Sequence, residues 1–194
     1  MIVRTTDPAD AAGLVAELYA DDLGDDGFVY QHTRAMALNP EAYAAFEALA
    51  RTIVPSIGLR TYELVTLGSA RALRSSHCLL AHGRKALRAG LVDEDQLVAL
   101  SHGEPAGLDA ADAAVIAYAE KLSTDAGAMA DADSQSLRDA GFSDRQIVDI
   151  TLAAALRNYL SRSLQALAVP VDDLPGLPPR VAAALRSAGT PQPD

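Results

Sequence analysis

The sequence predicts an all-α fold of about eight helices. Thirty-nine of the 194 residues are Ala, and Ala together with Leu is typical of closely packed helices. Apolar residues recur at helical spacing along most of the chain, and no stretch alternates apolar and polar residues for long enough to indicate a sheet. Hydrophobic residues make up 49% of the chain and charged residues 22%, which is the balance of a folded protein rather than a disordered one. We therefore expect one domain over residues 1–194.

Start and stop signals divide the first part of the chain. Asp7 and Pro8 are typical of an N-cap followed by the first residue of a helix. We expect a helix over 9–20, a loop over 21–27, a helix over 28–38 and a helix over 42–54. The loop is expected because its sequence, DDLGDDG, is acidic and contains Gly. Pro55 is expected to end the third helix, because proline lacks the N–H that an interior helical residue donates.

The rest of the chain is also helical in pattern. Residues 60–90 favour helix nearly throughout, and Gly90 is a usual C-terminal stop. Beyond it we expect helices over 93–100, 109–125, 134–140, 144–167 and 180–187, with a turn over 103–107. Residues 170–194 form a Pro-rich tail that contains the last of these helices. The helices over 42–54 and 144–167 carry more apolar residues than one solvent-facing surface tolerates, so we expect a homo-oligomer.

The net charge and the absence of targeting signals exclude some classes of partner and location from our expectations. The net charge is −10, and an acidic surface repels phosphate backbones, so nucleic acid is not an expected partner. No apolar run reaches the roughly 18 residues of a membrane span, and the N-terminal residues lack the pattern of a secretory signal. The single cysteine, Cys78, allows no intramolecular disulfide and fits a reducing compartment. We expect a cytoplasmic protein with no membrane partner.

The only cysteine lies beside two of the four histidines. Cys78 and His82 are four residues apart and share one face of a helix, while His77 directly precedes the cysteine. An imidazolium beside a thiol favours the thiolate, and a helix start near Ser75 would favour it further. We therefore expect charged histidines to make Cys78 reactive. The alternatives are a buried small hydrophobic residue and a zinc site without an obvious fourth ligand, and we expect no metal or other cofactor.

The surroundings of this cysteine carry a longer motif, since residues 63–83 read ELVTLGSARALRSSHCLLAHG. This segment resembles the core of the alkylhydroperoxidase D (AhpD)-like, carboxymuconolactone decarboxylase family. The family pattern is Glu, eleven residues, Cys-x-x-Cys, three residues and His. Glu63 falls on the family glutamate, Cys78 on the second cysteine and His82 on the distal histidine. His77 falls on a histidine that some peroxidase members carry between the cysteines, and Ser75 replaces the first cysteine.

The resemblance continues over about residues 10–170. Residues 157–162 are similar to part of the family's closing helix, here expected over 144–167, and the layout before Glu63 is most similar to the branch of peroxidase-related proteins. The resemblance implies a helical fold that assembles as trimers or hexamers. It also implies that the second cysteine attacks a hydroperoxide, activated by a Glu–His relay. Carried over to this sequence, Cys78 is the nucleophile and His82 links it to Glu63.

The departure at Ser75 leaves three functions open. A serine cannot form a disulfide with an oxidised Cys78, so an external thiol must reduce it. The first function is therefore a one-cysteine peroxidase or antioxidant enzyme that uses a small hydroperoxide and an external thiol. The second is a decarboxylase-type lyase, for which Arg71, Arg74 and Arg84 are candidate cations toward a substrate carboxylate. The third is a non-catalytic binding or assembly module.

A relay also makes a geometric demand on residues 60–90. Glu63 and His82 would lie about 28 Å apart in one straight helix, which no hydrogen bond can span. The relay therefore requires the chain to fold back between them. We expect the break over 73–76, where consecutive serines can cap a new helix, although the residues before it are good helix formers.

Overall fold

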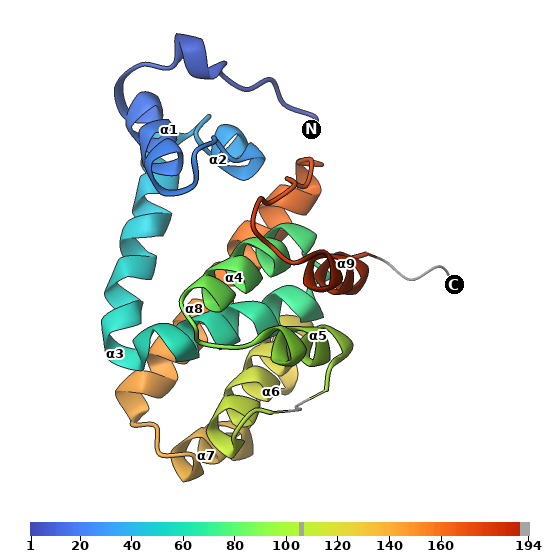
Figure 1. The fold of residues 1–194 in the computed structure, drawn as a ribbon. Coiled ribbons are helices and arrows are strands. Elements are labelled where there is room, and N and C mark those ends of the chain that lie inside the picture. The colour runs from blue at the N-terminus through green and yellow to red at the C-terminus, as the bar shows by residue number, and fades with distance from the viewer. Residues whose placement is uncertain (105–106, 191–194) are drawn as a thin grey trace.

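The computed structural model describes residues 1–104 and 107–190, and over these residues it contains nine α-helices and no strand (Figure 1). The helices are α1 (Gly13–Asp26), α2 (Gln31–Met36), α3 (Pro40–Ala72), α4 (Ser76–Arg88), α5 (Glu94–His102), α6 (Ala110–Asp125), α7 (Asp131–Asp139), α8 (Asp144–Ala166) and α9 (Pro179–Ala188). Two short 3₁₀ helices, Pro8–Asp10 and Ala126–Ala128, accompany them. The predicted all-α class is thus confirmed.

The core is built around the second half of α3. Residues 62–70 of this helix are all buried, because α4, α6 and α8 pack around it (Figure 1). Gly68 lets α6 approach closely, since a Cβ at this position would lie 3.2 Å from the carbonyl oxygen of Ile116. Within the described ranges, no helix is both long and apolar enough to cross a membrane.

The predicted stop at Pro55 is wrong in position. The helix that contains Pro55 begins at Pro40 and continues past the proline, and the chain bends three residues later, at Gly58. Gly58 has φ 79° and ψ 157°, a conformation that glycine adopts without the steric cost a side chain would add. The Gln146 side chain of α8 donates a hydrogen bond of 3.1 Å to the carbonyl of Ser56 next to this bend. A tertiary contact therefore satisfies a backbone group at the kink.

The loop predicted over 21–27 is also wrong, because α1 continues through Asp26 and ends at Gly27. Gly27 has φ 80° and its N–H bonds the carbonyl of Leu23, which is a left-handed helix ending. The Asp26 carboxylate is stabilised from outside its own helix, since Arg84 and Arg88 of α4 donate to it at 2.5 and 2.9 Å. The following helix, α2, covers only Gln31–Met36 of the predicted 28–38.

The predicted fold-back over 73–76 is present. The third helix ends at Ala72 and α4 begins at Ser76, and Arg74 between them has φ 52°. The Gln165 side chain donates to the carbonyls of Leu73 at 2.8 Å and Arg74 at 3.2 Å, so α8 holds the turn from outside. Ser75 occupies the N-cap position, but its side chain makes no capping hydrogen bond, contrary to expectation.

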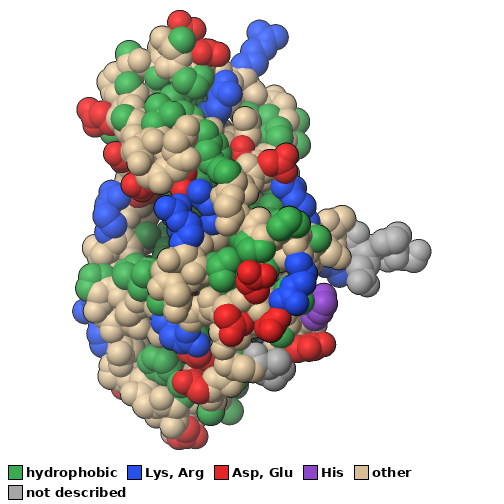
Figure 2. Space-filling model, in the orientation of Figure 1, with side chains coloured by type: hydrophobic (Ala, Val, Ile, Leu, Met, Phe, Trp, Pro, Cys, Tyr) green, Lys and Arg blue, Asp and Glu red, His purple; other side chains and the backbone are tan. Residues whose placement is uncertain are grey.

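The last helix closes the molecule against α4 and α5 (Figure 1). Leu185 of α9 is fully buried and approaches Gly83 of α4, where an added Cβ would lie 2.6 Å from a Leu185 methyl carbon. Two parts of the predictions lie outside the described residues. They are residues 191–194 of the tail predicted over 170–194, and residues 105–106 of the turn predicted over 103–107. Figure 2 shows Lys and Arg side chains beside a hollow, where the end of the molecule with α1 and α2 meets the rest.

Candidate active site

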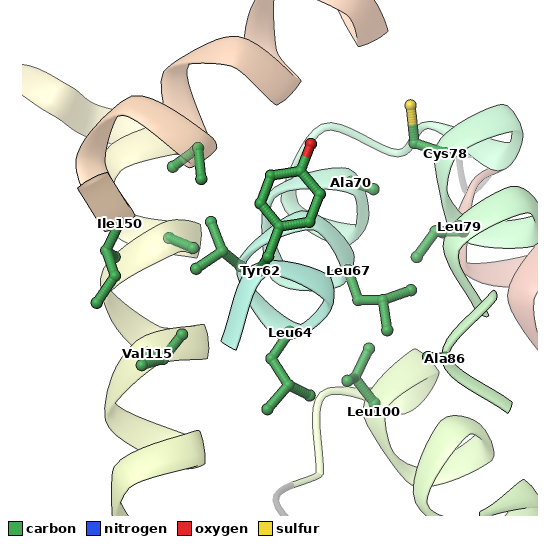
Figure 3. Close-up of a cluster of buried hydrophobic side chains, with 14 of the residues drawn as sticks. Tyr62, Leu64, Leu67, Ala70, Cys78, Leu79, Ala86, Leu100, Val115 and Ile150 are labelled. Carbon is green, nitrogen blue, oxygen red and sulfur yellow. The ribbon is translucent and has the colours of Figure 1, made fainter. Parts of the chain in front are cut away.

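Cys78 lies in the first turn of α4, at the border between the core and a pocket. The side chain is buried, and its sulfur points away from Leu67 and Leu100 of the hydrophobic cluster (Figure 3). A pocket of about 250 Å³ opens beside it, lined by residues of α1, α2, α3, α4 and α8. The only thiol of the chain is thus accessible from a cavity large enough for a small organic molecule.

The fold-back brings Glu63 and His82 together. Glu63 Oε2 of α3 and His82 Nδ1 of α4 lie 2.7 Å apart, although nineteen residues separate them in the chain. Their side chains are 6% and 12% exposed, so solvent competes little for this contact. The contact that the predicted relay requires is therefore made, and His82 lines the same pocket as Cys78.

The protonation states of this pair follow from burial and nearby charge. Burial and then the positive charge of Arg157 lower the pKa of His82 to about 4, despite the opposite effect of Glu63. Burial acts to raise the pKa of Glu63, but positive charge on His82, the hydrogen bond with His82 and the charges of Lys85 and Arg157 outweigh it and lower the pKa below its ordinary value. At pH 7 the pair is a carboxylate and a neutral imidazole. Nδ1–H then donates to Glu63, and Nε2 carries a free lone pair.

This state differs from the expectation that charged histidines activate the thiol. Besides His82, burial lowers the pKa of His77, although its bond to Val169 acts in the opposite direction. His77 Nε2–H donates to the carbonyl of Val169 at 2.8 Å, which fixes its ring next to Cys78. Because both imidazoles are neutral, a positive charge beside the Cys78 sulfur must come from another residue.

That charge belongs to Arg157 of α8, which sequence reasoning missed together with Ser161. Arg157 Nη1 lies 3.5 Å and Ser161 Oγ 3.2 Å from Cys78 Sγ. Both side chains are buried, at 3% and 0% exposure. They are four residues apart, so a pair of polar residues on the mostly apolar buried face of the helix was the available signal.

A third histidine of the pocket, His32 of α2, was also not predicted. Burial is the main cause that lowers its pKa to about 3, and any positive charge on His77 and the charge of Lys85 act in the same direction. No local motif marks His32, and only the packing of α2 brings it to the pocket. Among the described residues, no group of three or more His, Cys, Asp or Glu side chains could hold a metal ion.

Ser75 occupies the place of the family's first cysteine. Its hydroxyl is buried and has no hydrogen-bond partner in the described part of the chain. Because Cys78 is the only cysteine, an internal disulfide cannot form at this site. Reduction of an oxidised Cys78 by a thiol therefore requires a thiol from outside the chain.

The arginines suggested for a lyase lie elsewhere. Arg71 is paired with Glu120, and Arg84 with Asp26. None of the three, Arg74 included, is among the residues that line the pocket of Cys78. The cations that do line it are Arg51, Lys85 and Arg157. The expectation that these three arginines face a substrate is therefore corrected. Arg71 and Arg84 point to carboxylates of other helices, whereas α8 supplies the buried cation of the pocket.

The comparisons with known proteins agree with the fold and the motif. Residues 40–121 match the Carboxymuconolactone decarboxylase family. A structure described as an alkylhydroperoxidase AhpD core, an uncharacterized peroxidase-related protein from Ralstonia eutropha JMP134, is 20% identical with a TM-score of 0.73, covering 95% of this chain and 96% of that one. A peroxidase-related protein from Silicibacter sp. TM1040 is 23% identical with a TM-score of 0.67, covering 87% and 91%.

A protein with a different named activity has the same fold. The debrominase Bmp8, solved as a Cys-to-Ala variant in complex with 2,3,4-tribromopyrrole, is 18% identical with a TM-score of 0.76, and the match covers 97% of both chains. A search of curated proteins finds no match. The segment that matches the carboxymuconolactone decarboxylase family contains the motif around Cys78, and the solved structures share the fold of this chain.

Proposed function

We propose that the protein is a thiol-dependent peroxidase that reduces an organic hydroperoxide through Cys78. The observation that carries this proposal is the contact of 2.7 Å between Glu63 and His82, in the pocket that contains the only cysteine. A carboxylate that holds Nδ1–H leaves Nε2 as a base, which is how a histidine activates a nucleophile. The match of residues 40–121 to the Carboxymuconolactone decarboxylase family supports the proposal but does not name the substrate.

In the proposed first step, Nε2 of His82 takes the thiol proton of Cys78. A sulfur lone pair then attacks the terminal oxygen of the hydroperoxide, so that the S–O bond forms while the O–O bond breaks. The departing alkoxide takes the proton from His82. The products are a sulfenic acid on Cys78 and an alcohol, with the sulfur oxidised and the peroxide reduced.

The second step of the proposal restores the thiol from outside the chain. A small external thiol attacks the sulfenic sulfur, which releases water and leaves a mixed disulfide on Cys78. A second external thiol then attacks this disulfide, which frees the Cys78 thiol and forms the disulfide of the reductant. Ser75 takes no part in either reaction. The proposal sets this cycle in the cytoplasm, where small thiols are maintained in the reduced form.

The pocket favours an organic hydroperoxide over hydrogen peroxide. Besides Cys78 and His82, the pocket is lined by the apolar or aromatic side chains of Tyr43, Leu160 and Leu164. Its volume of about 250 Å³ exceeds the volume of hydrogen peroxide. Burial of an organic substituent against these side chains adds binding free energy that hydrogen peroxide cannot obtain. We therefore expect a higher kcat/KM for cumene hydroperoxide than for hydrogen peroxide.

The proposal is tested by measuring consumption of cumene hydroperoxide with dithiothreitol as the external thiol. The wild type is expected to consume peroxide far faster than the free thiol does, and to give a dimedone adduct at Cys78 when the reductant is left out. Cys78→Ser is expected to lose both. A Cys78→Ser variant that retains the peroxidase rate would overturn the proposal.

The same variant separates the other functions. Turnover of a β-keto or lactone acid that survives Cys78→Ser would indicate the lyase, and release of bromide from 2,3,4-tribromopyrrole that requires Cys78 would indicate dehalogenation. Absence of all three activities in a folded oligomer would indicate a binding or assembly module. Each of these results contradicts the peroxidase.

A further inference from the structure

Arg157 is a buried cation next to the reactive sulfur. Only 3% of the residue is exposed, and its Nε has no hydrogen-bond partner among the described residues. No carboxylate within the described ranges lies within 4.0 Å of its guanidinium, whereas the other buried arginine, Arg84, is paired with Asp26 at 2.5 Å. A buried charge without a partner is strongly destabilising. The group that Arg157 does contact is Cys78, through Nη1 at 3.5 Å.

The other groups around the sulfur do not supply this charge. The titratable residues that line the pocket or act on Arg157 are Asp21, Asp22, Asp25 and Asp26 (α1), Tyr30 before α2, His32 (α2), Tyr43, Glu47, Arg51, Tyr62 and Glu63 (α3), His77, His82 and Lys85 (α4) and Arg157 itself (α8). The three histidines have lowered pKa values, and Lys85 and Arg51 are exposed. Glu63 is anionic and would oppose a thiolate.

The hydroxyl of Ser161 complements the guanidinium. Ser161 Oγ lies 3.2 Å from Cys78 Sγ and is fully buried, and no other hydrogen bond of this hydroxyl is present in the described part of the chain. Arg157 and Ser161 are one turn apart on α8, so a single rigid helix presents both donors to the sulfur. A hydroxyl can turn its proton toward a thiolate, which is an acceptor only.

We infer that Arg157 and Ser161 hold the anionic sulfur of this site, with the guanidinium as the charge opposite the Cys78 thiolate and the hydroxyl as a second donor. His82 then acts only as a neutral base, and not as the charged partner that cysteine–histidine spacing suggests. This inference rests on Cys78 as the nucleophile of the proposed function, but on no particular substrate. In the peroxidase cycle, the same two donors face the sulfur when it becomes the sulfenic acid.

The experiment measures the rate of Cys78 alkylation by iodoacetamide against pH, with mass spectrometry as the readout. Because the chain has one cysteine, a single site reports the reaction. Arg157→Gln is expected to move the midpoint of the profile up by about 1 to 3 pH units, since an opposite charge is lost next to the sulfur. Arg157→Lys should keep most of the wild-type profile, and Ser161→Ala should move the midpoint in the same direction by less.

Two further variants distinguish the source of the charge. His82→Gln, whose amide can still donate to Glu63, is expected to leave the midpoint near the wild-type value. Arg162→Gln removes a charge from the exposed side of the same helix and is the matched control for net charge, with no shift expected. The fold of each variant is checked by circular dichroism. If Arg157→Gln does not fold, Ser161→Ala and Arg157→Lys still test the inference.

The result that would overturn the inference is a folded Arg157→Gln protein with the wild-type profile, or a shift in His82→Gln as large as in Arg157→Gln. Alkylation requires no peroxide, so its outcome is independent of the proposed function. A wild-type protein without peroxidase activity but with an Arg157-dependent profile would contradict only the proposed function.

Discussion

Burial of the contact between Glu63 and His82 determines the pH range in which His82 is neutral. Burial removes water from the imidazole, so His82 stays neutral to a pH well below its ordinary titration range, with a pKa of about 4. A neutral His82 is the form that accepts a proton from a thiol. If His82 is the proposed base, its basic form is fully populated above about pH 6 and is lost as the pH falls through about 4.

We predict an acid limb of kcat/KM that reflects this lowered pKa. The His82-dependent part of the peroxidase rate should fall with a midpoint near 4, rather than near the ordinary histidine value of about 6.5. His82→Gln should lower kcat/KM by about 10² to 10⁴-fold across the neutral range, because a general base is removed. Peroxide consumption from pH 3.5 to 8 checks both expectations. A midpoint near 6.5 in a folded wild type would contradict the neutral base.

The stability of the protein should follow the same titration. His82 and His32 have folded-state pKa values of about 4 and about 3, below their unfolded values near 6.5. The unfolded state therefore binds more protons in this interval, and the free energy of unfolding should fall as the pH decreases from about 6.5 toward 4. Urea denaturation of the wild type and of His32→Phe checks this, because the variant should lose less stability over the interval. An equal loss in both proteins would show that His32 does not titrate in this way.

Ser75, which falls on the first cysteine of the Cys-x-x-Cys pattern, allows a test of whether this position can form a disulfide with Cys78. Its buried hydroxyl lacks a partner, so the apolar character of a thiol suits this environment. We predict that Ser75→Cys, after one equivalent of peroxide, forms an internal disulfide with Cys78 and no longer gives a dimedone adduct. Ser76→Cys, one residue away and without the Cys-x-x-Cys spacing, is the control. Persistent sulfenic acid in Ser75→Cys would show that the two positions cannot be bridged.

The candidate residues that the sequence predicted share one local motif. Cys78, His82 and Glu63 were identified because their spacing is fixed within residues 63–82, and the contact of Glu63 with His82 bears out the expected geometry. Arg157 and Ser161 were missed, since residues 157–162 were interpreted as part of a helix that closes the fold. Their position next to Cys78 depends on the packing of α8 against α3, which one sequence without a structure does not reveal.

At the scale of elements, tertiary contacts decide the boundaries that propensity left open. The break between α3 and α4 lies in a stretch of good helix formers, and the Gln165 side chain satisfies the carbonyls exposed there. Likewise, the loop expected over 21–27 is helical because α4 supplies cations to Asp26. Helix existence was predictable from apolar spacing, whereas these ends depend on residues distant in the chain.

We predict that Gln165→Ala weakens the turn between α3 and α4. Loss of its hydrogen bonds to the carbonyls of Leu73 and Arg74 should lower the free energy of unfolding by about 1 kcal/mol. Gln135→Ala on α7 removes a side-chain hydrogen bond to Asp139 on an exposed surface and is the control, with little change expected. Urea denaturation measures both. Equal stability of the two variants would mean that local sequence alone sets the turn.

At the scale of the whole molecule, α3 and α8 carry several exposed apolar side chains. Val148, Leu152 and Tyr159 of α8 are 54%, 40% and 46% exposed, and their spacing places them on one side of the helix. Leu49 and Leu59 of α3 are exposed as well, at 42% and 46%. The ring of Phe46 of α3 lies tilted against that of Tyr159, with ring centroids 5.7 Å apart, which shows that the two helices adjoin there. Exposed apolar patches of this kind mark interaction surfaces.

We therefore predict a homo-oligomer, a trimer or a hexamer, that buries these side chains. Light scattering of the wild type at micromolar concentration should give a mass well above the 20.3 kDa of one chain. Leu152→Glu places a charge at the centre of the α8 stripe and should lower that mass, because an unpaired carboxylate cannot be buried without a large cost. Leu38→Glu, at an equally exposed leucine outside α3 and α8, should leave the mass unchanged. A monomeric wild type would contradict the assembly, and a Leu152→Glu protein of unchanged mass would place the interface on another surface.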